Sequence, residues 1–235
     1  MPEIMHETAL LRASVERIVA TIERLTDDQL RAASRLPGWT RAHVASHLAR
    51  SSDSRVRLLA AAREGTIGEQ YPSEEARAAD IEAGAARAAE AVRADARASL
   101  ERLLGEVERY PPDRWDAPGR WLGGEESPVH RVVPSMRREV EYHHVDLDAG
   151  YGPGDWPADF VEAQLRDVVA TMSERAQAPA VTLALAGERL RIRDGGRGSV
   201  TGEPSDLLGW LTGRATGDRL RMMPPGPLPA VPPLS

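Results

Sequence analysis

The apolar residues of this 235-residue chain change their spacing once, close to residue 150. Up to that point they recur at intervals of three and four, which is typical of helices that bury one face. Beyond Asp155, one further helical stretch is followed by the alternating segments 181–186 and 190–193, which are typical of half-buried strands. The chain is therefore predicted to be α+β, with a helical unit over residues 1–150 and a smaller α/β unit over residues 151–235.

Capping residues divide the first unit into helices. Thr26, Thr40 and Ser73 each precede a helical pattern and are good N-caps, and Gln29 completes a capping box with Thr26. Besides the short helix after Thr26, four substantial helices are expected, over residues 10–25, 40–63, 73–110 and 128–146. Four such helices with one long Pro- and Gly-rich connection predict an antiparallel four-helix bundle.

The second unit is predicted to hold a small sheet. Gly187 lies between the two alternating segments and indicates a hairpin, and residues 199–201 are a candidate third strand. Residues 206–214 are expected to form the last helix. The proline-rich tail from Met222 is expected to be a packed or frayed extension.

Composition excludes several classes of chemistry. The absence of cysteine rules out disulfides, Cys-ligated zinc, iron–sulfur clusters and a cysteine nucleophile, so any thiol chemistry must use a thiol from elsewhere. A net charge of −6 argues against binding to nucleic-acid phosphates. No apolar run of 18 residues is present, and the first residues lack the features of a signal peptide. We expect a cytoplasmic protein with no nucleic-acid or membrane partner.

Histidines and one glutamate recur at helical spacing. His43 and His47 are four residues apart, and so are Glu139 and His143. Side chains four apart lie on the same face of a helix, so Glu139 and His143 could hold one ion together with a third ligand from a facing helix. Two histidines and one carboxylate with an open position form a catalytic zinc set, and the same set also suits Fe(II). The alternative is that residues 137–139 are simply a solvated helix face.

Three segments resemble the mycothiol-dependent maleylpyruvate isomerase family. They are residues 36–50, LPGWTRAHVASHLAR; residues 138–147, REVEYHHVDL; and residues 200–214, VTGEPSDLLGWLTGR. The resemblance implies a DinB-like, metal-binding four-helix bundle followed by a small α/β domain similar to sterol carrier domains. It covers nearly the whole chain, in the expected order.

The resemblance also implies roles for individual residues. The family's zinc ligands fall on His47, Glu139 and His143, and Arg214 falls where an arginine is implied in mycothiol binding. Arg214 could equally be a helix C-cap. Asp146 could orient the ring of His143, or could only support the end of its helix.

Two further residues bear on the metal site that the resemblance implies. The resemblance leaves His43 as a packing or supporting residue one turn before His47. Ser51 stands where many relatives have asparagine. Because of this departure, the resemblance does not indicate which residues form the substrate side of the pocket.

The implied activity is a zinc- and mycothiol-dependent isomerisation. A zinc-bound thiol ionises readily, and its thiolate would add to the double bond of maleylpyruvate, allow rotation and leave. Arginines would hold the substrate carboxylates, although the sequence does not select which ones. A mycothiol S-transferase acting on other electrophiles and a non-catalytic metal-binding regulator remain alternatives. The chain contains no lysine or asparagine, which fits a GC-rich actinobacterial genome, and mycothiol is an actinobacterial thiol.

Overall fold

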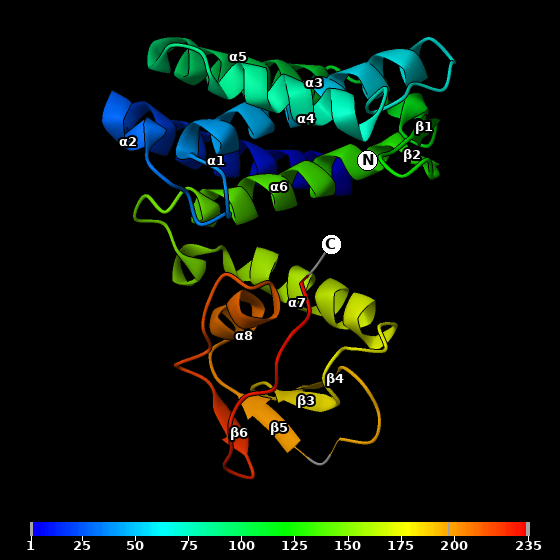
Figure 1. The fold of residues 1–235 in the computed structure, drawn as a ribbon. Coiled ribbons are helices and arrows are strands. Elements are labelled where there is room, and N and C mark those ends of the chain that lie inside the picture. Colours follow the sequence, from blue (N-terminus) through cyan, green and yellow to red (C-terminus); the bar gives the residue numbers. More distant parts are fainter. Residues whose placement is uncertain (1, 197, 234–235) are drawn as a thin grey trace. The chain divides into compact units, whose positions relative to one another are not determined.

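The protein is described here by a computed structural model that covers residues 2–196 and 198–233 (Figure 1). The chain divides into two compact units, Met1–Ala149 and Gly150–Ser235. Within the described ranges, no helix is both long enough and apolar enough to cross a membrane.

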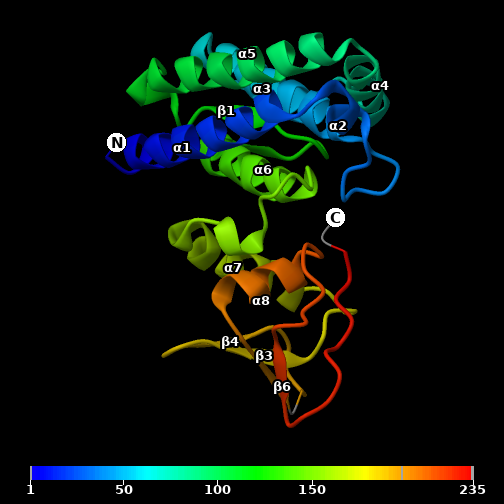
Figure 2. The ribbon, with the colours of Figure 1, turned by 90° about the vertical axis from the view of Figure 1, so that its left-hand side faces the viewer.

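The first unit is a helical bundle with a small two-stranded ribbon. Its helices are α1 (Pro2–Arg24), α2 (Asp27–Arg31), α3 (Arg41–Arg63), α4 (Glu74–Ala85), α5 (Ala89–Glu108) and α6 (Val132–Asp146), and its strands are β1 (Pro118–Arg120) and β2 (Glu126–Pro128). The long helices α1, α3, α5 and α6 lie side by side in both views (Figures 1 and 2). They enclose a core of aliphatic side chains that includes Ile18, Leu48, Leu100 and Met136. The predicted α+β class with a helical first domain is confirmed.

The prediction of one long helix over residues 73–110 is wrong, because this segment forms the two helices α4 and α5. Gly84, near the end of α4, lies so close to α3 that a Cβ atom added there would be 2.2 Å from the Ser46 hydroxyl oxygen. That hydroxyl donates to the carbonyl of Ile81 at 2.9 Å and fixes α4 on α3. The chain leaves helical geometry at Ala88 (φ −57°, ψ 143°), and α5 then packs along α3 as a separate helix.

The second unit combines two helices with a four-stranded sheet. Its elements are α7 (Ala158–Ser173), β3 (Val181–Ala184), β4 (Arg189–Arg191), β5 (Gly198–Thr201), α8 (Pro204–Leu211) and β6 (Arg221–Met223). The strand order is β4-β3-β5-β6, with β3 and β5 parallel and the other pairs antiparallel. The helices α7 and α8 pack together over one face of this sheet (Figures 1 and 2).

Two details of the second unit bear on the sequence predictions. The hairpin at Gly187 is confirmed, and this residue has the positive φ (85°) that glycine adopts without strain. The expectation of an extension from Met222 was incomplete, because Met222 pairs with Val200 as part of β6. Three residues before a run of prolines carry too little alternation to indicate a strand.

Candidate metal centre

A capping box at the start of α3 places His47. The backbone N–H of Thr40 donates to His43 Nδ1 at 3.2 Å, and the Thr40 hydroxyl oxygen accepts from the N–H of His43. This reciprocal pair begins the helix and uses the His43 ring. His47 lies one turn further on, facing the bundle interior with 4% of its surface exposed.

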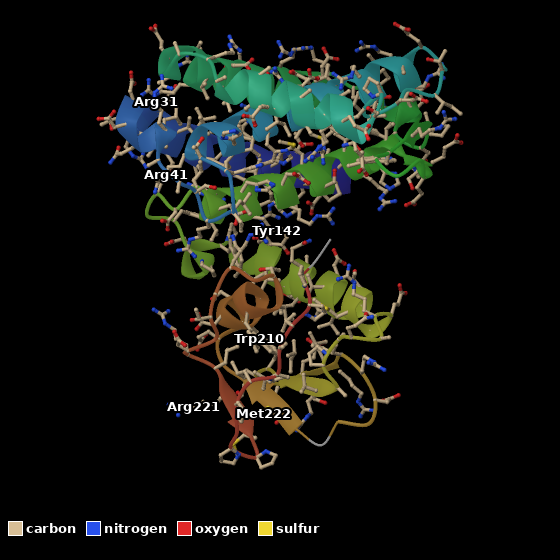
Figure 3. All side chains as sticks on the ribbon, in the orientation of Figure 1. Arg31, Arg41, Tyr142, Trp210, Arg221 and Met222 are labelled. Carbon is tan, nitrogen blue, oxygen red and sulfur yellow. The ribbon has the colours of Figure 1, made fainter. Side chains whose placement is uncertain are left out.

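The start of α3 is tied to the end of α6, which carries Glu139 and His143. Arg41, labelled in Figure 3, donates from Nε to the carbonyl of Leu147 at 2.6 Å and from Nη2 to the carbonyl of Asp148 at 2.7 Å. A cation beside the carbonyls at a helix C-terminus is favourable. The contact therefore fixes the two helices that bear the candidate ligands.

His47, Glu139 and His143 meet where α3 faces α6. His47 Nε2 lies 2.9 Å from Glu139 Oε2, and His143 Nε2 lies 3.5 Å from the same oxygen. One ligand-type atom from each of the three residues lies within 4.8 Å of the others. The two imidazole rings meet edge to face, with centroids 4.5 Å apart.

The electrostatic environment shifts the pKa values of the two histidines in opposite directions. Burial is the largest influence on His47 and lowers its pKa to about 4, assisted by the charge of His143. Burial also lowers the pKa of His143, but hydrogen bonds to Asp146 and Glu139 outweigh it, and that pKa is raised. Burial raises the pKa of Glu139, yet its hydrogen bonds to both histidines prevail and hold that pKa well below its ordinary value. Glu139 is therefore ionised.

Each ligand-type histidine has a partner on its other ring nitrogen. Asp146 Oδ2 lies 2.9 Å from His143 Nδ1, and Asp146 is 2% exposed. This contact supports the orienting role considered for Asp146, because a carboxylate there favours the proton on Nδ1 and leaves Nε2 free to bind. The backbone carbonyl of Asp146 also accepts from the N–H of Arg35, so a supporting role at the helix end remains compatible. The partner of His47 Nδ1 is the guanidinium of Arg77, at 3.1 Å.

Other sequence candidates lie elsewhere. His43 contacts Glu82 at 3.1 Å, and His144 bonds to the hydroxyl of Thr21 at 2.8 Å, so neither joins the cluster. Arg214 belongs to the second unit, where its Nη1 donates to the carbonyl of Thr212 at 3.2 Å.

Two arginines beside the cluster were not singled out from the sequence. Arg55 is 3% exposed, donates to the Ser51 hydroxyl at 2.5 Å and lies 3.9 Å from Glu139 Oε1. It stands eight residues after His47, so a buried arginine on the same side of α3 was a usable signal. Arg77 gave no such signal, because it lies 30 positions from His47 on a different helix.

The donor set fits a divalent ion. Two imidazole nitrogens and one carboxylate oxygen are a known ligand set for catalytic zinc. Ligand bonds of about 2.0–2.1 Å at tetrahedral angles separate neighbouring donor atoms by about 3.3 Å, and the separations from Glu139 Oε2 bracket that value. For these two separations, adjustments of a few tenths of an ångström would suffice.

These features define a class of protein: a helical bundle with a candidate His₂Glu metal centre, joined to a small α/β domain. The family described as "Mycothiol maleylpyruvate isomerase N-terminal domain" matches residues 11–148, and "MDMPI C-terminal domain" matches residues 155–233. The chain belongs to the mycothiol maleylpyruvate isomerase family, which confirms the resemblance seen in its sequence.

Solved structures agree with this fold. Crystal structures of the mycothiol-dependent maleylpyruvate isomerase and of its variant with one histidine replaced by alanine match this chain with TM-scores of 0.92 and 0.91. Each match covers 98% of this chain and 97% of the other, at 22% sequence identity. No curated protein sequence matches significantly.

Proposed function

We propose that this chain is a zinc- and mycothiol-dependent enzyme that isomerises maleylpyruvate, or a related cis unsaturated acid, to the trans form. The observation that carries the proposal is the cluster of His47, Glu139 and His143, assembled from two helices in a chain that has both domains of the family. The enzymatic activity named for the similar crystal structures is consistent with it.

The residues of the cluster would each have a distinct task. A zinc ion bound there would supply a Lewis acid that favours the ionised form of a thiol. Asp146 keeps the His143 proton on Nδ1, so that Nε2 presents its lone pair. Burial of His47 favours its neutral form, which is the form that binds metal.

Arg214 is proposed to contact the body of mycothiol. Its hydrogen bond to the Thr212 carbonyl also fits a helix-capping role, and the two roles make different predictions. Arg214→Ala should weaken mycothiol binding, measured by calorimetry, without changing metal content. If Arg214 is only a cap, the variant should lose about 0.3–1 kcal/mol of stability and bind mycothiol as the wild type does.

The function is tested by product analysis. Purified zinc-loaded protein is incubated with mycothiol and maleylpyruvate, and the cis and trans acids are followed by chromatography. We expect trans product with no net consumption of thiol, and no product when zinc or mycothiol is omitted or when His143 is replaced by alanine. A stable thiol adduct would instead identify an S-transferase, and no turnover with a panel of electrophiles would refute an enzymatic role for the cluster.

A further inference from the structure

The contact between Arg77 and His47 constrains the proton on the imidazole ring. Arg77, near the start of α4, places Nη2 3.1 Å from His47 Nδ1, while His47 Nε2 lies 2.9 Å from the Glu139 carboxylate. A guanidinium can only donate hydrogen bonds, and an ionised carboxylate can only accept them. The neutral ring therefore carries its proton on Nε2, donates it to Glu139, and accepts from Arg77 through Nδ1.

A metal on the Glu139 side of the ring reverses this arrangement. An ion bound to Nε2 requires the lone pair of that nitrogen, so the neutral ring must carry its single proton on Nδ1. His47 Nδ1–H and the Arg77 guanidinium are then two donors 3.1 Å apart. Neither can accept from the other, so their hydrogen bond is lost and both become available to an acceptor that enters beside them.

The surrounding charge favours an anionic acceptor. Arg55 is buried beside Glu139, and the positive charges of Arg77 and Arg138 lie close enough to act on the Arg55 guanidinium. The three positive charges of these guanidiniums outnumber the two negative charges of Glu139 and Asp146, the carboxylates that contact His143, even before a divalent cation is added. Arginine remains charged at any ordinary pH and matches the planar fork of a carboxylate.

We propose that Arg77 and His47 Nδ1–H together bind one carboxylate of the substrate, and that this clamp forms only when a divalent ion occupies the Nε2 side of the ring. The inference rests on the proposed function and adds a specificity residue to it: the preferred substrate is an unsaturated acid whose carboxylate reaches Arg77. The ring of Tyr71, 5.8 Å from the Arg77 guanidinium carbon, supports that side chain.

Binding of maleate tests the clamp without turnover. Maleate is titrated calorimetrically into zinc-loaded and metal-free wild type, and into zinc-loaded Arg77→Gln and Arg57→Gln. Arg57 is the matched control, because it lies over the same Tyr71 ring at 5.9 Å but donates to the carbonyl of Gln70. We expect zinc-loaded wild type to bind at least tenfold more tightly than the metal-free protein or Arg77→Gln, and Arg57→Gln to bind within twofold of wild type.

Zinc affinity of the same variant provides a second readout. Glutamine at position 77 offers a carbonyl oxygen that can accept from His47 Nδ1–H, so Arg77→Gln should bind zinc at least as tightly as wild type. If Arg77 only supported His47, the variant would lose zinc together with maleate, and the clamp would be refuted. Unchanged maleate binding in Arg77→Gln, an equal loss in Arg57→Gln, or no maleate binding to zinc-loaded wild type would also overturn it.

These results separate the clamp from the proposed function. A wild type that binds zinc, turns over maleylpyruvate with mycothiol, and binds maleate independently of Arg77 refutes the clamp alone. A wild type that binds no divalent metal refutes both.

Discussion

Replacing Asp146 tests whether the partner of His143 Nδ1 tunes the metal centre. Asp146 Oδ2 lies 2.9 Å from the ring nitrogen, and the carboxylate is almost fully buried. Asp146→Asn preserves the shape and can still accept the hydrogen bond through its amide oxygen, but it removes the negative charge. Asp146→Ala removes the acceptor as well.

The expected losses follow from the two changes. Removing a supporting partner of a metal-bound histidine typically costs about 10–100-fold in metal affinity, which corresponds to about 1.4–2.7 kcal/mol. A charge-assisted hydrogen bond is roughly twice as strong as a neutral one. We therefore expect a loss of about 10-fold for Asp146→Asn and about 100-fold for Asp146→Ala.

Zinc affinity is measured by competition with a chromophoric chelator at pH 7.5, with circular dichroism as a check on folding. Asp148→Asn is the matched control, because Asp148 is exposed, pairs with Arg35 at 3.1 Å, and has a positive φ (51°) that asparagine tolerates. The control should retain zinc affinity within twofold. Equal affinity in the wild type and Asp146→Ala would refute the orienting role, and so would an equal loss in the control.

Three further predictions concern the histidines. His47→Ala and His143→Ala should each lose the bound ion while the bundle stays folded, and full occupancy by elemental analysis in both would refute the centre. His43→Ala should keep the metal but lose about 1 kcal/mol of unfolding free energy, measured with urea, because its ring caps α3. The pKa of His143 is raised above its ordinary value, whereas that of His47 is about 4. In mildly acidic solution, therefore, only the His143 ring takes up a proton that competes with the metal. Zinc affinity should therefore fall about tenfold per unit between about pH 6 and pH 5, whereas about a hundredfold per unit would mean that both rings compete.

The sequence by itself determined the local structure. The intervals of three and four, together with the caps Thr26, Thr40 and Ser73, predicted the starts of three helices, because capping is a bond between residues three positions apart. The same locality placed Glu139 and His143 on one face of α6. Predictions from bulk composition, such as a cytoplasmic location and no nucleic-acid partner, stay predictions.

Tertiary structure decided what depends on contacts between distant segments. The chain breaks between α4 and α5 at Ala88, and Gly84 and Ser46 show how closely α4 packs on α3, which local sequence patterns do not indicate. His47 meets Glu139 across 92 positions, and Arg77 meets His47 across 30. Periodicity reports which face of a helix is buried but not which other helix covers that face. The family signature selected His47 over His43, and spacing along α3 could have indicated Arg55. Arg77 is placed beside His47 only by the packing of α4 on α3.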